Sequence, residues 1–174
     1  MIQPDLAVRE AGAGDAAAIA RIYNHYVETT SISMETAAVS GDEMAARIAA
    51  VRCAGLPWLV LLDGGEIDGE IAGYAHATQW RARPGYRHAV EASVYLAPGR
   101  RGRGWGAHLY RALLARLVGH CHSVIGGIAL PNPASVALHE HLGFRQVACF
   151  SQVGRKFGEW VDVAYWQLLL PMDV

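Results

Sequence analysis

The stretch that decides the fold of this chain reads Val94-Tyr95-Leu96-Ala97-Pro98-Gly99-Arg100-Arg101-Gly102-Arg103-Gly104-Trp105-Gly106. An apolar strand reaches a Pro-Gly break, after which glycines alternate with arginines and lead directly into the helical pattern of residues 107–114. Glycines leave backbone N–H groups uncovered, and the N-terminus of a helix attracts anions. The stretch therefore predicts a pyrophosphate cradle between a strand and a helix.

Three kinds of nucleotide-binding loop compete for this stretch. A P-loop needs Gly-Lys followed by Ser or Thr, whereas this chain has Gly106-Ala107, so a P-loop is excluded. The dinucleotide fingerprint fits residues 102–107, but it needs a carboxylate about 20 residues further on, and none occurs before Glu140. The third is Arg/Gln-x-x-Gly-x-Gly/Ala, here Arg101-Gly102-Arg103-Gly104-Trp105-Gly106, which resembles the acetyl-coenzyme A signature of the GNAT superfamily of N-acetyltransferases. A glycine-rich turn that only caps a helix is the structural alternative.

Length and composition indicate one globular domain that covers residues 1–174. Hydrophobic residues make up 52% and charged residues 18%, with a net charge of −1, so we expect neither disorder nor a nucleic-acid partner. The longest apolar runs, such as Trp58 to Leu62, are far too short to cross a membrane. Cys53, Cys121 and Cys149 lie outside any C-x-x-C motif and suit reduced thiols. A cytoplasmic protein without membrane association is expected.

Hydrophobic periodicity and turn residues place the elements along the chain. Strands are expected at residues 6–9, 58–62, 67–79, 89–96, 124–130, 144–153 and 161–169, and helices at about 16–28, 41–54, 107–118 and 134–141. This order predicts an α/β (α+β) fold with a mixed, mostly antiparallel central sheet flanked by about four helices. Strands 89–96 and 124–130 are the expected parallel pair, with ends that splay apart around a narrow ligand.

Three further segments extend the resemblance beyond the cradle. They are Tyr23-Asn24-His25-Tyr26-Val27-Glu28-Thr29-Thr30-Ser31, Leu130-Pro131-Asn132-Pro133-Ala134-Ser135-Val136-Ala137-Leu138-His139-Glu140-His141-Leu142-Gly143-Phe144 and Val153-Gly154-Arg155-Lys156-Phe157-Gly158-Glu159-Trp160-Val161-Asp162-Val163. With the cradle, they resemble the phosphinothricin N-acetyltransferase branch of the GNAT superfamily, whose relatives also acetylate methionine sulfone and methionine sulfoximine. The resemblance covers most of the chain and implies the GNAT-like fold and an acetyl-CoA-dependent N-acetyltransferase.

The resemblance also implies a coenzyme site. The expected residues are Val94, Tyr95, Leu96, Gly102, Arg103, Gly104, Trp105, Gly106, Ala107 and Asn132. A strand edge can pair with the pantetheine amides as a further strand would, and the loop amides and helix dipole can meet the pyrophosphate. The Asn132 side chain can offer both a donor and an acceptor to pantetheine. Its alternative role is that of a helix cap.

Glu91 resembles the general base of the family, and it begins the strand that leads into the cradle. Partial burial there would raise its pKa toward the working pH, as proton abstraction from an ammonium requires. The alternative is a structural carboxylate paired with an arginine such as Arg87. A strand amide near Tyr95 or Leu96 could donate to the developing oxyanion.

His139 stands where many GNAT enzymes have a tyrosine that protonates the departing sulfur, and the phosphinothricin branch commonly has histidine there. The resemblance implies that it acts as a general acid or holds a water molecule. His141 lies two residues on, on a different helix face, so the two rings cannot chelate one metal ion. No metal site is predicted.

The loop of residues 80–87 resembles the family loop that faces the acceptor. The expected acceptor-binding residues are Arg81, Arg83, Tyr86, Glu91, Ser93 and Met34. Guanidinium groups suit a carboxylate or phosphinate, because they bind such anions through two parallel hydrogen bonds. A charged, solvated loop is the alternative.

The leading hypothesis is acetylation of the α-amino group of a small anionic amino acid or analogue, similar to phosphinothricin or to methionine sulfone and sulfoximine. Met34 replaces a phenylalanine and Arg155 a tyrosine that are usual in the branch, so the acceptor stays open. The alternatives are a protein or peptide N-terminal acetyltransferase and a module that binds acetyl-CoA without catalysis. The presence of both Glu91 and His139 argues against the second alternative. The resemblance also implies a homodimer.

Overall fold

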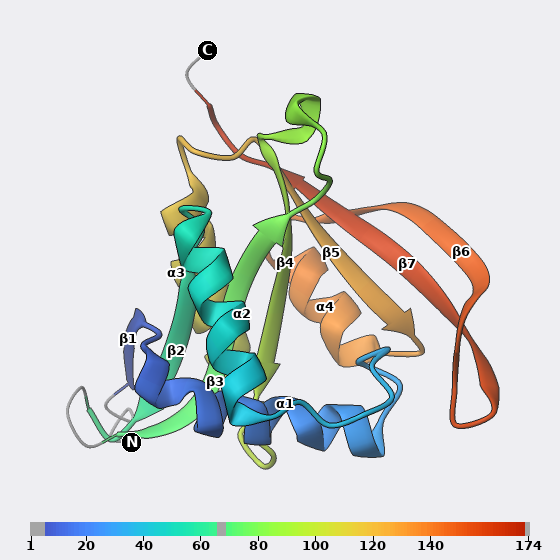
Figure 1. Ribbon diagram of the computed structural model, residues 1–174. Coiled ribbons are helices and arrows are strands. Elements are labelled where there is room, and N and C mark those ends of the chain that lie inside the picture. The colour runs from blue at the N-terminus through green and yellow to red at the C-terminus, as the bar shows by residue number, and fades with distance from the viewer. Residues whose placement is uncertain (1–5, 66–68, 173–174) are drawn as a thin grey trace. The chain divides into compact units, whose positions relative to one another are not determined.

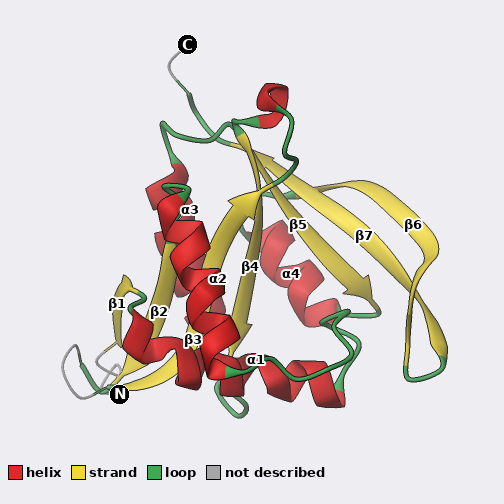
Figure 2. Ribbon diagram, in the orientation of Figure 1, coloured by secondary structure: helices red, strands yellow, loops and turns green. Residues whose placement is uncertain are grey.

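The computed structural model describes residues 6–65 and 69–172, and within these ranges it has four α-helices and seven strands (Figures 1 and 2). In chain order the elements are β1 (Leu6–Glu10), the 3-10 helix η1 (Ala13–Asp15), α1 (Ala16–Thr29), α2 (Gly41–Cys53), β2 (Trp58–Asp63), β3 (Glu70–Gln79), the 3-10 helix η2 (Pro84–Tyr86), β4 (Ala89–Leu96), α3 (Trp105–Leu117), β5 (Ser123–Leu130), α4 (Pro133–His141), β6 (Arg145–Lys156) and β7 (Glu159–Leu169). The predicted start of the third strand, at residue 67, lies outside the described residues.

The seven strands are hydrogen-bonded in the order β1-β2-β3-β4-β5-β7-β6. Strand β2 is antiparallel to β1 and β3, and β7 is antiparallel to β5 and β6. Strands β4 and β5 are parallel, and their paired residues run from Ala89 opposite Ser123 to Glu91 opposite Ile125. The predicted mixed, mostly antiparallel sheet with one parallel pair is confirmed. Beyond Glu91, both strands continue without further pairing to each other.

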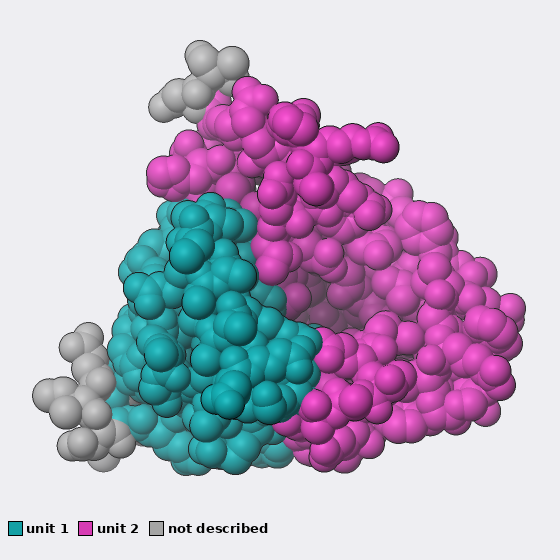
Figure 3. Space-filling view, in the orientation of Figure 1, with its two compact units in different colours: residues 1–23, 39–77, 94–116 teal, residues 24–38, 78–93, 117–174 magenta. Residues whose placement is uncertain are grey.

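The chain divides into two compact units (Figure 3). Unit 1 comprises residues 1–23, 39–77 and 94–116, and unit 2 comprises residues 24–38, 78–93 and 117–174. Strands β3 and β4 each contribute residues to both units. The single domain expected from the chain length stays a prediction.

Unit 1 contains β1, β2, most of β3, and the helices α2 and α3. Helix α2 begins at the N-cap Ser40, whose hydroxyl accepts a hydrogen bond from the Glu43 backbone N–H. Its buried side chains Met44, Ile48 and Val51 recur at intervals of four and three residues, which places them on one face. Among the described residues the longest helix is α1, with 14 residues, and no helix there is long and apolar enough to cross a membrane.

Unit 2 contains β5, β6, β7 and α4. The last two strands are longer than the sequence pattern predicts, because β6 continues to Lys156 and β7 begins at Glu159. Between them Phe157 and Gly158 have φ angles of +50° and +84°, which suits a two-residue hairpin turn that continues the twist of both strands. The predicted loop between residues 153 and 161 is therefore mostly strand.

A row of aromatic rings crosses the sheet in unit 1. Trp58 on β2 lies opposite His76 on β3, and their rings are stacked with centroids 4.2 Å apart. Trp58 also stacks against Tyr74, whose ring stacks against Tyr95. The Trp58 Nε1 and His76 Nδ1 atoms are buried without a hydrogen-bond partner. Burial, and secondarily the positive charge of Arg47, lowers the pKa of His76 to about 4.

We expect this histidine to make the protein less stable in acid. In the unfolded chain His76 has a pKa of about 6.5, so the unfolded state takes up the proton first as the pH falls. The free energy of unfolding should therefore decrease between about pH 6.5 and about pH 4, by on the order of 3 kcal/mol. Urea unfolding of the wild type and of His76→Phe over this range measures the effect, and the variant should show a flatter dependence. His120→Gln, which removes an exposed histidine, is the control. Equal slopes in wild type and His76→Phe would contradict the assignment.

Candidate functional site

The glycine-rich loop lies in unit 1 and leads into α3 as predicted. Gly99, Gly102 and Gly104 have φ angles of +80°, +77° and +78°, which side chains with a Cβ rarely adopt. No atom lies within 4 Å of where a Cβ would stand at any of the three. Residues 101–104 are exposed, and the first N–H groups of α3 have no acceptor within the helix. The loop thus fits an anionic phosphate group.

Arginines on both sides of the loop hold Trp105, the buried first residue of α3. The guanidinium groups of Arg100 and Arg103 each lie 5.4 Å from the centroid of the Trp105 ring. Arg100 also forms ion pairs with Asp63 at 2.5 Å and Glu70 at 3.1 Å. Arg100 therefore braces the loop, whereas Arg103 is exposed beside it.

The predicted coenzyme residues Tyr95 and Leu96 lie at the C-terminal end of β4. Tyr95 packs its ring against Tyr74 and, edge to face, against Tyr23. A Cβ at Gly73 would lie 2.7 Å from Leu96 Cδ2 and 2.8 Å from the Tyr95 carbonyl oxygen, so only glycine lets β3 approach β4 here. Because the side chains of Tyr95 and Leu96 pack against other residues, a ligand at this segment would bind to its backbone groups.

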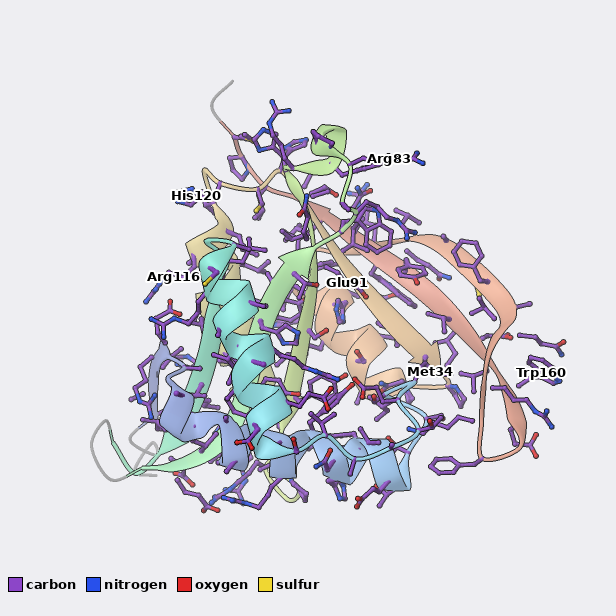
Figure 4. All side chains as sticks on the ribbon, viewed as in Figure 1. Met34, Arg83, Glu91, Arg116, His120 and Trp160 are labelled. Atoms are coloured by element: carbon purple, nitrogen blue, oxygen red, sulfur yellow. The ribbon has the colours of Figure 1, made fainter. Side chains whose placement is uncertain are left out.

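Glu91 lies in unit 2, near the start of β4 (Figure 4). Burial raises the pKa of its carboxyl group, and the positive charge of Arg81 partly opposes the rise. The arginine whose charge acts on Glu91 is thus Arg81. The alternative hypothesis, a structural carboxylate paired with an arginine, named Arg87 instead. A Cβ at Gly127 on β5 would lie 3.1 Å from Glu91 Oε1 and 3.2 Å from Cε1 of Tyr165 on β7.

Two aromatic rings pack against Tyr165, the residue that shares the Gly127 position with this carboxylate. The Trp80 ring meets the Tyr165 ring edge to face at 5.6 Å, and the Phe150 ring does so at 5.8 Å. The Arg81 guanidinium lies 4.8 Å from the Trp80 ring centroid. Burial, and then the charge of Glu91, raises the pKa of Tyr165, so its phenol stays protonated at neutral pH. A partly buried carboxyl group, a guanidinium group and an aromatic wall are therefore neighbours in unit 2.

The other predicted acceptor-binding residues differ in how exposed they are and in how their side chains lie relative to Glu91. Arg83 is exposed, and Figure 4 shows it at the outer end of its loop, directed away from Glu91. Tyr86 is 45% exposed. Ser93 follows Glu91 by two residues on β4, so both side chains project from the same face of the strand. Of the predicted loop residues, only Arg81 has a charge that acts on Glu91.

Met34 packs against β6, where a Cβ at Gly154 would overlap its terminal methyl group. Its neighbour Ser33 accepts a 2.6 Å hydrogen bond at its carbonyl oxygen from the buried Lys156 Nζ. Burial lowers the pKa of Lys156, and the charge of Glu35 partly opposes this. The loop that carries Met34 is thus tied to the β6–β7 hairpin.

His139 on α4 is 4% exposed and packs on the other face of β5 from Glu91. Its Nδ1 atom lies 2.8 Å from the Ser135 carbonyl oxygen, one helical turn earlier. A Cβ at Gly126 would overlap its imidazole ring, whereas a Cβ at Gly127 would point at Glu91, because successive residues of a strand face opposite sides. Burial lowers the pKa of His139, with the Ser135 bond opposing the shift, so the neutral ring is favoured at pH 7.

Asn132 is the N-cap of α4, because its Oδ1 atom accepts a 3.2 Å hydrogen bond from the Ser135 N–H. Asn132 therefore does cap the helix, which was the alternative to its role in binding the coenzyme. The cap uses only the side-chain oxygen, so the Nδ2 group can still donate a hydrogen bond to a ligand.

Sequence reasoning missed three residues of this arrangement. Gly126 and Gly127 interrupt an apolar strand, which is a sign of close approach by other groups. Tyr165 lies in an ordinary strand pattern and gives no such sign. Within residues 6–65 and 69–172, no three His, Cys, Asp or Glu side chains are grouped as a metal site would require.

Comparison with known proteins adds to this geometry. The model of the acetyltransferase (GNAT) domain matches residues 8–165. The chain is 41% identical over 170 residues to the L-amino acid N-acyltransferase MnaT of Escherichia coli, covering 95% of this chain and 94% of that protein. It is 39% identical over 170 residues to an L-methionine sulfoximine/L-methionine sulfone acetyltransferase of Salmonella typhimurium, covering 95% of each. A phosphinothricin acetyltransferase from Sinorhizobium meliloti, solved in complex with AcCoA, superposes with a TM-score of 0.88 at 35% identity, covering 95% of this chain and 88% of that one.

The contact between Gly126 and His139 predicts a measurable loss of stability. Gly126→Ala places a methyl group into the imidazole ring, so it should lower the free energy of unfolding by about 1–3 kcal/mol. Urea unfolding measures this, with Gly14→Ala as control because nothing lies within 4 Å of that Cβ position. Adding His139→Ala to Gly126→Ala should relieve the overlap, so the two substitutions should be non-additive. Additive effects, or a loss no larger than that of Gly14→Ala, would contradict the packing.

Proposed function

We propose that this chain, which belongs to the GNAT acetyltransferase family, acetylates the α-amino group of a small anionic amino acid or analogue. The predicted family is confirmed, because the family model matches most of the chain and relatives about 40% identical cover nearly all of it. The chain is an N-acetyltransferase that depends on acetyl-CoA. The acceptor is our proposal. Its support includes relatives that are named for L-amino acids and for methionine sulfoximine and sulfone.

The observation that carries the proposal is the environment of Glu91. A base for an ammonium group must be able to take up a proton near neutral pH, and burial raises the pKa of this carboxyl group in that direction. The Arg81 guanidinium adds a positive charge near the same carboxylate. An acceptor with both an amine and an acidic group matches this pair of opposite charges.

The residues proposed to hold acetyl-CoA are Val94, Tyr95 and Leu96, then Gly102, Arg103, Gly104, Trp105, Gly106 and Ala107, and Asn132. The exposed glycine loop and the start of α3 fit the pyrophosphate, since both present backbone N–H groups. The backbone of residues 94–96 would pair with pantetheine amides. Acetyl-CoA bound by these residues would supply the acetyl thioester for the reaction.

Glu91 Oε1 is proposed to take a proton from the acceptor ammonium, which frees the nitrogen lone pair for attack on the acetyl carbon. The nitrogen forms a bond to the acetyl carbon, the C–S bond breaks, and coenzyme A leaves as a thiolate that takes up the second proton released by the nitrogen. A backbone N–H near Tyr95 or Leu96 would donate to the oxygen on which negative charge develops. For His139 we propose the role of holding a water molecule. Its lowered pKa favours the neutral ring, and a general acid must carry the proton that it gives.

We also propose a cytoplasmic homodimer. Six large apolar side chains on and beside β6 and β7 are more than half exposed in the single chain. They are Val147, Phe150, Val153, Phe157, Trp160 and Leu169. Large apolar side chains exposed in this number are typical of a protein–protein interface. The cysteines Cys53, Cys121 and Cys149 are free thiols, which suits a reducing compartment.

We expect Glu91→Gln to lower kcat by on the order of a hundredfold at about pH 7, because glutamine cannot accept the proton. The loss should shrink toward pH 9, where more of the acceptor amine is already unprotonated. Thiol release from acetyl-CoA measures turnover, and calorimetry should show unchanged coenzyme affinity. Wild-type kcat in the variant from about pH 6 to about pH 9 would remove Glu91 from the mechanism.

We expect Arg81→Ala to raise the KM of an anionic amino acid on the order of tenfold, while a neutral amine loses far less. It should also move the acidic limb of kcat/KM to higher pH, because the charge that holds the Glu91 pKa down is removed. A screen of phosphinothricin, methionine sulfone and a simple alkylamine tests both points. Arg83→Ala is the matched control, with a smaller expected effect. Unchanged acceptor ratios and an unchanged pH profile in Arg81→Ala would show that the acceptor is held elsewhere.

A further inference from the structure

We infer that Gly127 and Tyr165 determine the acceptor specificity of the enzyme. They do so by limiting the size of the substituents that the acceptor can carry next to its amine. We call the space between Glu91 Oε1 and the edge of the Tyr165 ring, above the Gly127 Cα, the Gly127 gap. The inference rests on the proposed function, because it concerns the acceptor of that same reaction.

Three neighbouring strands form the Gly127 gap. Tyr165 on β7 is the antiparallel partner of Gly127 on β5, so the two residues are held at one level by the sheet register. Glu91 stands on β4, whose parallel pairing to β5 ends at Glu91 opposite Ile125. A Cβ at Gly127 would lie 3.1 Å from the carboxylate oxygen and 3.2 Å from Tyr165 Cε1. A methyl group at position 127 would therefore press on both the carboxylate and the Tyr165 ring, yet Gly127 itself is exposed.

The Tyr165 wall of the gap is fixed in place. The Trp80 and Phe150 rings meet the Tyr165 ring edge to face, at interplanar angles of 77° and 82°. These contacts come from two different parts of the chain, the segment after β3 and strand β6, which pairs with β7. A turn of the Tyr165 ring away from the gap would lose both contacts. The wall is thus a rigid limit for an incoming group.

The position of the base relates this gap to the acceptor. An acceptor that gives its proton to Glu91 Oε1 must place its amine nitrogen next to this oxygen. The α-carbon of the acceptor is bonded to that nitrogen and therefore lies nearby. The substituents of this carbon therefore lie close to the Gly127 gap. An unbranched side chain has only hydrogens to place beside the ring, whereas a β-branched one must place a methyl group there. The charge of Arg81 then selects an acidic group further along the acceptor.

The test compares two acidic acceptors that differ by one methyl group at the β-carbon, L-glutamate and 3-methyl-L-glutamate. Thiol release from acetyl-CoA gives kcat/KM for each, and their ratio is the measure of selectivity. Tyr165→Leu should lower the preference for the unbranched acceptor on the order of tenfold, the usual effect of one methyl group in an apolar site. Gly127→Ala should raise that preference by a similar factor, since it narrows the gap.

Two further variants keep the test decisive. Tyr165→Phe retains the ring and should keep the wild-type ratio, whereas a change as large as that of Tyr165→Leu would assign the effect to the hydroxyl and overturn the inference. Gly14→Ala is the control for glycine replacement, because its Cβ position is open. If Tyr165→Leu does not fold, Gly127→Ala decides alone.

The proposed function and this inference fail in different ways. A wild-type protein that acetylates neither glutamate, methionine sulfone nor phosphinothricin refutes the proposed function. Activity on such acceptors with the same ratio in wild type and Gly127→Ala refutes only the inference.

Discussion

Other groups closely approach both faces of strand β5 at its centre, and the candidate chemistry of unit 2 depends on this constraint. On one face a Cβ at Gly126 would overlap the His139 ring, and on the other a Cβ at Gly127 would crowd Glu91 and Tyr165. Alanine at the first position would force the His139 ring on α4 to shift, and alanine at the second would fill the space beside the Glu91 carboxylate. Two glycines, each less favourable in a strand than alanine, are retained because both faces are occupied.

The electrostatics near Glu91 result from two opposing effects of unequal size. Burial is the larger effect and raises the pKa of the carboxyl group, and the Arg81 charge is the smaller and lowers it. Arg81 is exposed, so water screens its charge, whereas the desolvation of Glu91 comes from the sheet itself. The carboxyl group thereby remains a better proton acceptor than an exposed glutamate. The protonated phenol of Tyr165 adds no second negative charge beside it.

Local pattern was enough to predict most elements of the fold. The parallel pair and the glycine loop before α3 follow from apolar runs and Pro-Gly breaks. The predicted end of β6 at residue 153 was wrong, because the strand continues to a turn that needs a positive φ at Phe157. Phenylalanine seldom adopts a positive φ, so the sequence does not indicate this turn. The pairing of Gly127 with Tyr165 could not be predicted, since the two residues meet through the β5–β7 register. That the charge of Arg81 acts on Glu91 depends on the direction of its side chain, which the sequence does not show.

The two candidate proton-handling residues are separated by β5, and this limits how they can share the work. Glu91 lies on the face of Gly127, where an acceptor amine would meet it, and His139 lies on the face of Gly126 with its Nδ1 atom next to the Ser135 carbonyl. A proton taken by Glu91 therefore has no direct path to His139 through the strand. In the proposed mechanism, Glu91 returns its proton to solvent on its own face. The departing thiolate takes up the second proton that the acceptor nitrogen releases, relayed through a water molecule that the neutral imidazole positions, so His139 itself neither gains nor loses a proton.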